Sequence, residues 1–477
     1  MSTNEKPTVL IVGAGLGGLM LGALLEKSGV PYTIFERAAT VKPLGAGMAV
    51  GPTLFPVFEQ LGIYDEFLSI GKYLSFVKGY EETKKSLKFT NENDYSQITE
   101  FGGYGMYIVA RPVLYDLILR QVPAHKILFG KRVLNISEED DKVTVHTSDN
   151  GVHEGNIIVG ADGAYSAVRQ RLYEKLRTEG KLPKSDQEDL PFSCTCLVGQ
   201  TKALDPEVYP LVKEPHCQFL ITMGDEKPFT WSLMSTAQNT LCWTVICHLT
   251  KTTSKAAMEQ RFRNNDNAEW GAYPAQVMCD ETKDFLVPVG NGKMTLGDIY
   301  DLTPKEIISK VMLEEKVFDT WHSGRVVLLG DACHKLNPAG GHGAVTALHD
   351  AIALANLFYA MPTKTSADMT RIFEDYKSER YPAVMESFHH SQRFSRIADR
   401  GFVGALFKFL ITHMPAWLWR IALAKMARFK PQAGFLPAAE AKGSVVPVVS
   451  PSEQRARDVF EKYQQRQREQ QQSAATV

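Results

Sequence analysis

The chain has few cysteines, and their spacing forms no recognisable framework. Seven cysteines in 477 residues are too few and too irregularly placed for a fold held by disulfides. Cys194-Thr195-Cys196 is too tightly spaced for the usual pair of zinc ligands, and Cys242 and Cys247 fall in an apolar, strand-like run. The sequence therefore predicts reduced cysteines and no metal site.

The chain also lacks an excess of charge of one sign and a long apolar run. A formal net charge of −1 gives no reason to expect nucleic acid as a partner. No stretch reaches the roughly 20 uninterrupted apolar residues of a transmembrane helix, and Met1–Lys6 is too polar for a secretory signal. With 44% hydrophobic and 22% charged residues, we expect a soluble, cytoplasmic enzyme long enough for two cores.

The first informative motif is a glycine-rich turn near the N-terminus. An apolar strand over 8–12 precedes it, a helix over 19–27 follows, and a second strand over 32–35 ends in Glu36-Arg37. In this βαβ order, Gly13 permits the tight turn, Gly15 lets the backbone approach a pyrophosphate, and Gly18 permits close packing of helix on strand. Glu36 can accept hydrogen bonds from an adenosine ribose. The motif predicts a dinucleotide site but does not distinguish FAD from NAD.

Two further glycine turns follow in the chain. Gly160-Ala161-Asp162-Gly163 comes after a buried strand over 157–159. Gly330-Asp331-Ala332-Cys333-His334 comes after a strand over 326–329, and Pro338, Gly341 and Gly343 lead into a helix over 344–359. Three such turns in this order resemble the class A FAD-dependent monooxygenases related to para-hydroxybenzoate hydroxylase.

The resemblance implies a non-covalently bound FAD and assigns contacts to it. Asp331 would bind the ribityl chain, and backbone N–H groups at the start of the 344–359 helix would stabilise negative charge on the reduced flavin ring. Asp162 and Arg169 would organise the pocket and the path of the nicotinamide cofactor. The remaining FAD contacts it implies are Gly13, Gly15, Gly18, Glu36, Arg37, Gly47, Arg111, Gly341, Gly343 and Ala344.

The sequence departs from the family at two positions of the third turn. His342 stands where the family usually has Gln, and Val345 stands where it usually has Asn. Backbone contacts survive both changes, whereas a side-chain amide contact does not. His342 is either a hydrogen-bonded structural residue or a proton-handling group beside the flavin. We take His342 and Pro338, in the same loop, as the candidate catalytic residues.

The fold expected from these features is α/β, with a Rossmann-type FAD-binding domain, an inserted β-sheet substrate domain and a helical C-terminal region. Phe219, Phe229, Trp231 and Trp243 either line a substrate pocket or pack in the core of the sheet domain. The expected boundaries are 1–72, 108–185 and 290–400 for the FAD-binding domain, 73–107 and 186–289 for the sheet region, 401–463 for the C-terminal helices and 464–477 for a disordered tail.

The chemistry that the resemblance implies needs no catalytic triad and no metal. Only one dinucleotide fingerprint is present, so NAD(P)H is expected to bind transiently, reduce FAD and leave. Reduced flavin then reacts with O₂ to give a C4a-hydroperoxide that hydroxylates or epoxidises the substrate. Rival interpretations are a flavin reductase or dehydrogenase, a halogenase (although no Trp-x-Trp-x-Ile-Pro signature is present) and a flavoprotein scaffold.

The C-terminal region bears on the substrate. Its segments 414–419 and 430–437 resemble fungal members that act in secondary metabolism, which favours a lipophilic natural product of aromatic, terpenoid or indole type. Segment 402–426 is apolar but interrupted by basic residues, with Trp417 and Trp419 within it. It either rests on a membrane surface or packs as a helix pair on the FAD-binding domain.

Overall fold

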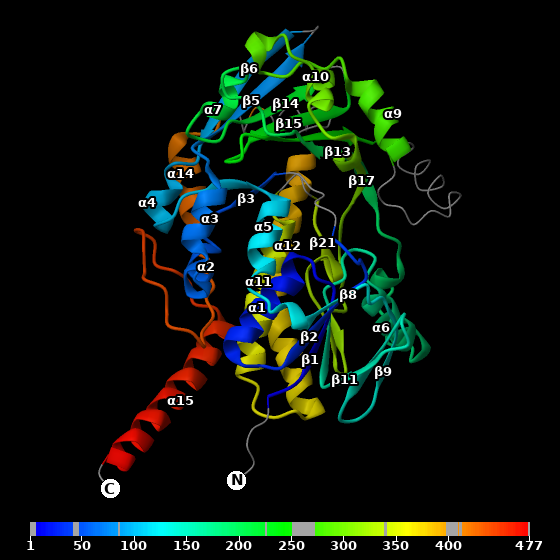
Figure 1. Cartoon of the computed structure of the whole chain (residues 1–477), viewed down its shortest axis with the longest axis vertical. Coiled ribbons are helices and arrows are strands. Elements are labelled where there is room, and N and C mark those ends of the chain that lie inside the picture. The colour runs from blue at the N-terminus through cyan, green and yellow to red at the C-terminus, as the bar shows by residue number, and fades with distance from the viewer. Residues whose placement is uncertain are drawn as a thin grey trace.

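The computed structural model describes residues 6–41, 47–83, 86–224, 227–249, 272–337, 341–396, 409 and 413–475. Two sheets lie at opposite ends of the long axis, with helices packed around the lower one (Figure 1). The fold is mixed α/β, as predicted. The predicted catalytic Pro338 lies outside the described residues.

The lower sheet brings the three glycine turns together. Its six strands run in the order β19-β20-β12-β1-β2-β8, parallel except for β19. Val12, Gly160 and Leu328 are in register at the carboxyl ends of β1, β12 and β20, and each of these strands leads into one turn. The bounds are β1 Val9–Val12, β2 Tyr32–Glu36, β8 Ile127–Phe129, β12 Ile157–Gly160, β19 His322–Ser323 and β20 Val326–Leu328.

Helices cover the lower sheet, and their apolar residues pack against its buried strands in one core. Helix α1 (Leu16–Ser28) packs against α11 (Gly343–Tyr359). Gly17 faces α11, since an added Cβ would lie 3.4 Å from the Ala347 Cβ, and it would also lie 2.5 Å from a Leu329 methyl carbon. The other elements around this sheet are α2 Phe55–Leu61, α3 Tyr64–Ile70, α5 Arg111–Leu119, α6 Ala167–Thr178, α12 Ser366–Arg396 and the antiparallel strands β9 Val133–Glu138, β10 Val143–Thr147 and β11 Val152–Gly155.

The upper sheet combines two distant segments of the chain. Its order is β17-β13-β16-β15-β14-β5-β6, and only the β14–β5 pair is parallel. Helices α9 (Ala272–Thr282) and α10 (Leu296–Asp301) cover one face. The bounds are β5 Phe76–Thr83, β6 Ser86–Asp94, β13 Phe192–Gln200, β14 Phe219–Gly224, β15 Phe229–Ser235, β16 Leu241–His248 and β17 Ser309–Glu314, with the short α7 Pro210–Lys213 beside them.

The aromatic residues of the upper sheet divide between its two faces. Trp231 and Trp243 are fully buried, and their indole N–H groups donate to the Leu286 carbonyl (2.9 Å) and to Thr303 Oγ1 (3.0 Å). They pack with Phe229 in the core under α9 and α10. Phe219 instead packs in a separate apolar cluster toward the lower half of the molecule. The packing interpretation therefore holds for both tryptophans and for Phe229.

A small sheet joins the two halves. Strands β3 (Gly47–Val50), β7 (Tyr107–Ala110) and β4 (Lys72–Tyr73) are antiparallel. In its register Gly47 lies opposite Ala110, the residue before Arg111. Two predicted FAD contacts from distant parts of the sequence thus become neighbours, because β7 leads directly into α5.

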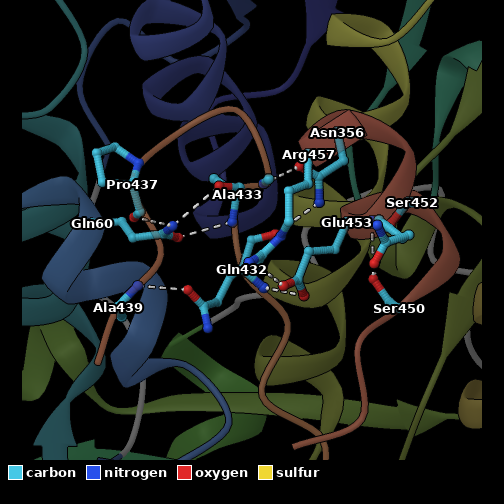
Figure 2. A network of polar contacts seen from close by, with 12 residues as sticks. Gln60, Asn356, Gln432, Ala433, Pro437, Ala439, Ser450, Ser452, Glu453 and Arg457 are labelled. Atoms are coloured by element: carbon cyan, nitrogen blue, oxygen red, sulfur yellow. Dashed lines mark hydrogen bonds and ion pairs between the residues drawn. The ribbon is translucent and has the colours of Figure 1, made fainter. Parts of the chain in front are cut away.

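The C-terminal segment after α14 (Ala416–Met426) crosses the lower half and is tied to it by polar contacts. Asn356 of α11 accepts from the Gly434 N–H (2.8 Å) and donates to the Gln432 carbonyl (2.8 Å). Gln60 of α2 accepts from the Ala433 N–H (2.9 Å) and donates to the Ala433 carbonyl (3.1 Å) (Figure 2). These bonds fasten the segment to both helices.

The structure corrects the prediction of a disordered tail. Helix α15 extends from Pro451 to Ala475 and projects from the body at the bottom of the view (Figure 1). Its first turn is docked, since buried Glu453 accepts from the Gln432 N–H (3.1 Å). Gln, Glu and Arg have high helix propensity, so a docked first turn supplies the costly nucleus from which the exposed part continues.

Candidate FAD site

The first turn has the geometry that the glycines predicted. Gly13 has a φ of +109°, which a side chain would strain, and its N–H donates to the Phe35 carbonyl (2.8 Å). A Cβ added at Gly18 would lie 2.1 Å from the Gly13 oxygen, whereas one added at Gly15 would meet no atom within 4 Å. Gly13 and Gly18 are thus required by packing, and the Gly15 backbone faces open space.

Glu36 fixes this turn from the end of β2. Its carboxylate accepts from the Ala14 N–H (2.9 Å) and from the Ala38 N–H (2.8 Å). Arg37 is exposed beside it. A carboxylate here remains able to accept from ribose hydroxyls, because each oxygen has more than one lone pair.

Asp162, in the second turn, caps a helix. Its carboxylate accepts from the Ser166 hydroxyl (2.5 Å) and from the N–H groups of Ala167 (2.7 Å) and Val168 (3.2 Å) at the start of α6. Burial raises the pKa of Asp162, while these hydrogen bonds lower it. The contacts made by this side chain therefore join the second turn to the start of α6.

Arg169 links the second turn to the third. Its guanidinium is buried, donates to the Ala332 carbonyl (2.8 Å) and to the Ala164 carbonyl (2.5 Å), and lies 4.2 Å from the centre of the Phe318 ring. Because Ala332 belongs to the turn that carries Asp331, a side chain of α6 holds the third turn in place.

The third turn presents Asp331 at its surface. A short 3₁₀ helix, η5 (Gly330–Ala332), begins at Gly330, whose φ is +62°. The Asp331 side chain is 40% exposed, and its nearest cation is Lys335, 3.3 Å away. This weak, exposed pair leaves the carboxylate available to a ligand.

The loop after the third turn opens onto α11. An added Cβ at Gly341 or Gly343 would meet no atom within 4 Å, so the backbone here, as at Gly15, is unobstructed. Gly343 and Ala344 are the first residues of α11, where N–H groups lack intrahelical acceptors. Both ends of the site can therefore accommodate a flat or charged group against bare backbone, which fits FAD.

His342 precedes α11 and faces a second histidine. The rings of His342 and His390 are 5.2 Å apart at an interplanar angle of 66°. Burial, and then the proximity of His390, lower the pKa of His342 to about 4. The side chain is therefore neutral at pH 7, and a neutral imidazole can accept one hydrogen bond and donate another.

Gly47 and Arg111 complete the set of predicted residues. Arg111 is exposed as the first residue of α5, and no hydrogen bond or ion pair of its side chain occurs among the described residues. A Cβ at Gly47 would lie 3.1 Å from Cys242 Cβ and 3.3 Å from Met234 Sδ. Strand β3, which begins at Gly47, therefore touches the upper sheet directly.

A family model described as an FAD binding domain matches residues 6–285 and 297–391. The chain belongs to this FAD-binding family. Its cofactor is FAD, and the protein is an oxidoreductase of the FAD-dependent monooxygenase type. The resemblance inferred from the three turns is thereby confirmed at the level of the family.

Individual relatives and structures agree. Two fungal relatives are each called FAD-dependent monooxygenase. olcE of Penicillium canescens is 28% identical over 410 residues, covering 82% of this chain and 81% of the relative. paxM of Penicillium paxilli is 28% identical over 398 residues, covering 81% and 77%. The structure of Klebsiella pneumoniae HpxO with FAD and uric acid shares the fold, with a TM-score of 0.67, 18% identity, and 88% and 96% coverage.

The structure adds residues that sequence reasoning missed. Asp350 and Arg380 form a fully buried pair behind the third turn (2.8 Å). His349 is buried one residue earlier, and its pKa is lowered to about 3 by burial and by Arg380. Asp350 lies in the helix that follows the third turn, and the sequence predicted no role for it. Arg380 lies in a long amphipathic helix, where no sequence signal distinguishes it from a surface arginine.

Proposed function

We propose that the protein uses NAD(P)H and O₂ to hydroxylate or epoxidise a lipophilic small molecule of aromatic, terpenoid or indole type. The observation that carries this proposal is an apolar cluster that meets β3 at Gly47. The upper sheet contributes Met234, Cys242 and Phe219 to it, Leu423 comes from α14, and Ala427 is the residue that follows this helix. A substrate bound beside this packed cluster would meet apolar groups.

FAD, when bound, would supply the oxygen chemistry. The residues of the chain bind the cofactor, orient it and exclude water. Under this proposal Asp331 holds the ribityl chain, Glu36 the ribose, and Arg111 the phosphates or ribityl oxygens. The N–H groups in the first turn of α11 would stabilise negative charge on the flavin ring.

We assign His342 a proton-handling role within the same proposal. A neutral imidazole at the N-terminus of α11 lies where the family usually has Gln, and its partner His390 comes from α12. Pro338, in the same loop, stays a candidate from the sequence alone.

The test begins with the purified protein, which should be yellow and release one FAD per chain on denaturation. A panel of lipophilic aromatics, terpenoids and indoles is then screened for stimulated NADH and NADPH oxidation, and products formed under ¹⁸O₂ are analysed by mass spectrometry. Incorporation of one ¹⁸O atom supports the proposal. Stimulated oxidation with reduced product and no ¹⁸O would favour a reductase, and halide-dependent product would favour a halogenase.

We further propose that α14 rests on a lipid surface, from which a lipophilic substrate reaches the cluster. Trp417, Leu418 and Ile421 are 63%, 41% and 56% exposed, while Leu423 packs inward. No helix in the described part of the chain is both long and apolar enough to cross a bilayer. The contact would rest on apolar burial, since Arg420 is already paired with Glu100.

Vesicle flotation tests this second proposal. Phosphatidylcholine vesicles should carry the wild type upward, and the exposed-face double variant Trp417→Ser/Ile421→Ser should stay at the bottom with its FAD content intact. Equal recovery of both proteins in the bottom fraction would leave α14 as a packed helix only. Flotation without any turnover on the substrate panel would favour a flavoprotein scaffold.

A further inference from the structure

A buried charged network lies directly behind the turn that carries Asp331. Asp350 of α11 accepts from His334 Nε2 (2.6 Å), from Arg380 Nε of α12 (2.8 Å) and from the Gly330 N–H (3.2 Å). The side chains of His334 and Asp350 are 0% exposed and that of Arg380 is 2% exposed. One carboxylate therefore receives donors from the turn itself and from a helix that carries no FAD motif.

The carboxylate at the centre of this network is ionised. Burial alone would raise the pKa of Asp350, but His334 and Arg380 hold it at about 2, so the carboxylate is ionised. Its charge is matched by Arg380, which has no neutral form in proteins. Breaking such a pair by removing one partner leaves an uncompensated buried charge, which is far costlier than losing an exposed pair.

The network fixes the turn at several points. Asp350 holds the Gly330 N–H at the start of η5 and His334 just beyond its end, and Arg169 holds the Ala332 carbonyl between them. Arg380 Nη2 also reaches the Thr346 carbonyl (3.5 Å) in the first turn of α11. The two segments that would border the flavin, η5 and the start of α11, are thus joined through Arg380 and Asp350.

We propose that Asp350 and Arg380 are positioning residues that pre-organise the Asp331 turn for FAD, so that α12 helps determine cofactor affinity without touching the cofactor. The inference rests on the assignment of Asp331 to FAD. Pre-organisation matters because, if the turn becomes ordered only when FAD binds, the free energy of that ordering is subtracted from the binding free energy of FAD.

The test uses the holoenzyme and its variants. Asp350→Asn and Arg380→Met should each raise the FAD dissociation constant at least tenfold and alter the visible circular dichroism of the bound flavin. Arg380→Lys, which retains the charge, should stay within about threefold of the wild type. Glu453→Gln is the matched control, because Glu453 is equally buried but holds the C-terminal segment. It should lower the melting temperature without changing either flavin measurement.

Asp331→Ala separates this inference from the site assignment. If Asp331→Ala loses FAD but Asp350→Asn and Arg380→Met bind it as the wild type does, the positioning role is refuted and the site stands. If Asp331→Ala itself retains full affinity, the assignment beneath the inference fails.

A measurement on the wild type tests the same inference if the variants fail to fold. Hydrogen exchange of the peptide containing Gly330–Cys333 should be slow in the protein stripped of FAD and should change little when FAD is added back. Fast exchange that becomes slow only with FAD would show that the cofactor, and not the network, orders the turn.

Discussion

Replacing Gly15 by alanine should separate cofactor binding from folding at the first turn. Gly15 is the N-cap of α1, and its φ of −72° and ψ of 177° are open to any residue. An added methyl group would meet no protein atom within 4 Å. The apoprotein should therefore fold normally, with stability changed by no more than about 0.4–1 kcal/mol from the smaller entropy of the unfolded chain.

The same methyl group would stand where the backbone is expected to approach the pyrophosphate. Losing one hydrogen bond to a charged group costs about 1.5–3 kcal/mol, which corresponds to a loss of roughly 10–150-fold in FAD affinity. Flavin fluorescence during titration of the apoprotein measures the affinity, and thermal unfolding of the same sample measures stability. Both measurements are needed, because the FAD affinity should fall while the stability of the apoprotein should stay nearly unchanged.

Gly18→Ala is the contrasting variant. Its Cβ would lie 2.1 Å from the Gly13 carbonyl oxygen, so the turn must shift and the apoprotein itself should lose stability. Should Gly15→Ala bind FAD as tightly as the wild type, the pyrophosphate does not pass this turn. If Gly15→Ala lowers the stability of the apoprotein as much as Gly18→Ala does, Gly15 is not surrounded by open space.

Four other substitutions test the third turn and the start of α11. Asp331→Ala should weaken FAD binding by about 10–150-fold, the worth of a charged hydrogen bond, with little change in unfolding temperature because the side chain is exposed; unchanged affinity would remove Asp331 from the site. Val345→Asn should keep FAD bound, whereas Val345→Pro should weaken binding more because it removes an N–H from the first turn of α11; equal damage from both would place that turn away from the flavin. His342 has a folded pKa of about 4 against about 6.5 unfolded, so it favours the folded state above pH 6.5 and this contribution is lost as pH falls toward 4. His342→Gln should therefore flatten the fall in melting temperature across that range, and a wild-type slope in the variant would exclude His342 as its source.

Local sequence patterns were enough to predict the first turn. Strand, glycine turn, helix and acidic strand end are encoded within about thirty consecutive residues, and Gly13 and Gly18 permit the tight turn and the close helix packing expected of them. The two later turns could be recognised as motifs, and their convergence on one cofactor followed only from the family resemblance. In the structure they meet because β12 and β20 are parallel neighbours of β1.

The C-terminal tail shows the limit of compositional reasoning. A segment rich in Gln with no apolar face has no core to bury, which is why disorder was predicted. Helix α15 extends through most of it because the docking of its first turn, by Glu453 on a segment that Asn356 and Gln60 also hold, is a tertiary contact.

The sequence by itself determined where the three glycine turns lie, since each depends on glycine, and the two later ones also on aspartate, at fixed positions in a short stretch of backbone. Only the tertiary structure decided that Trp231 and Trp243 are core residues and that Asp162 caps a helix. It alone joined Arg380 to the turn that bears Asp331. These outcomes depend on which elements pack against each other, and burial sets the partners and the ionisation of such side chains whatever their distance along the chain.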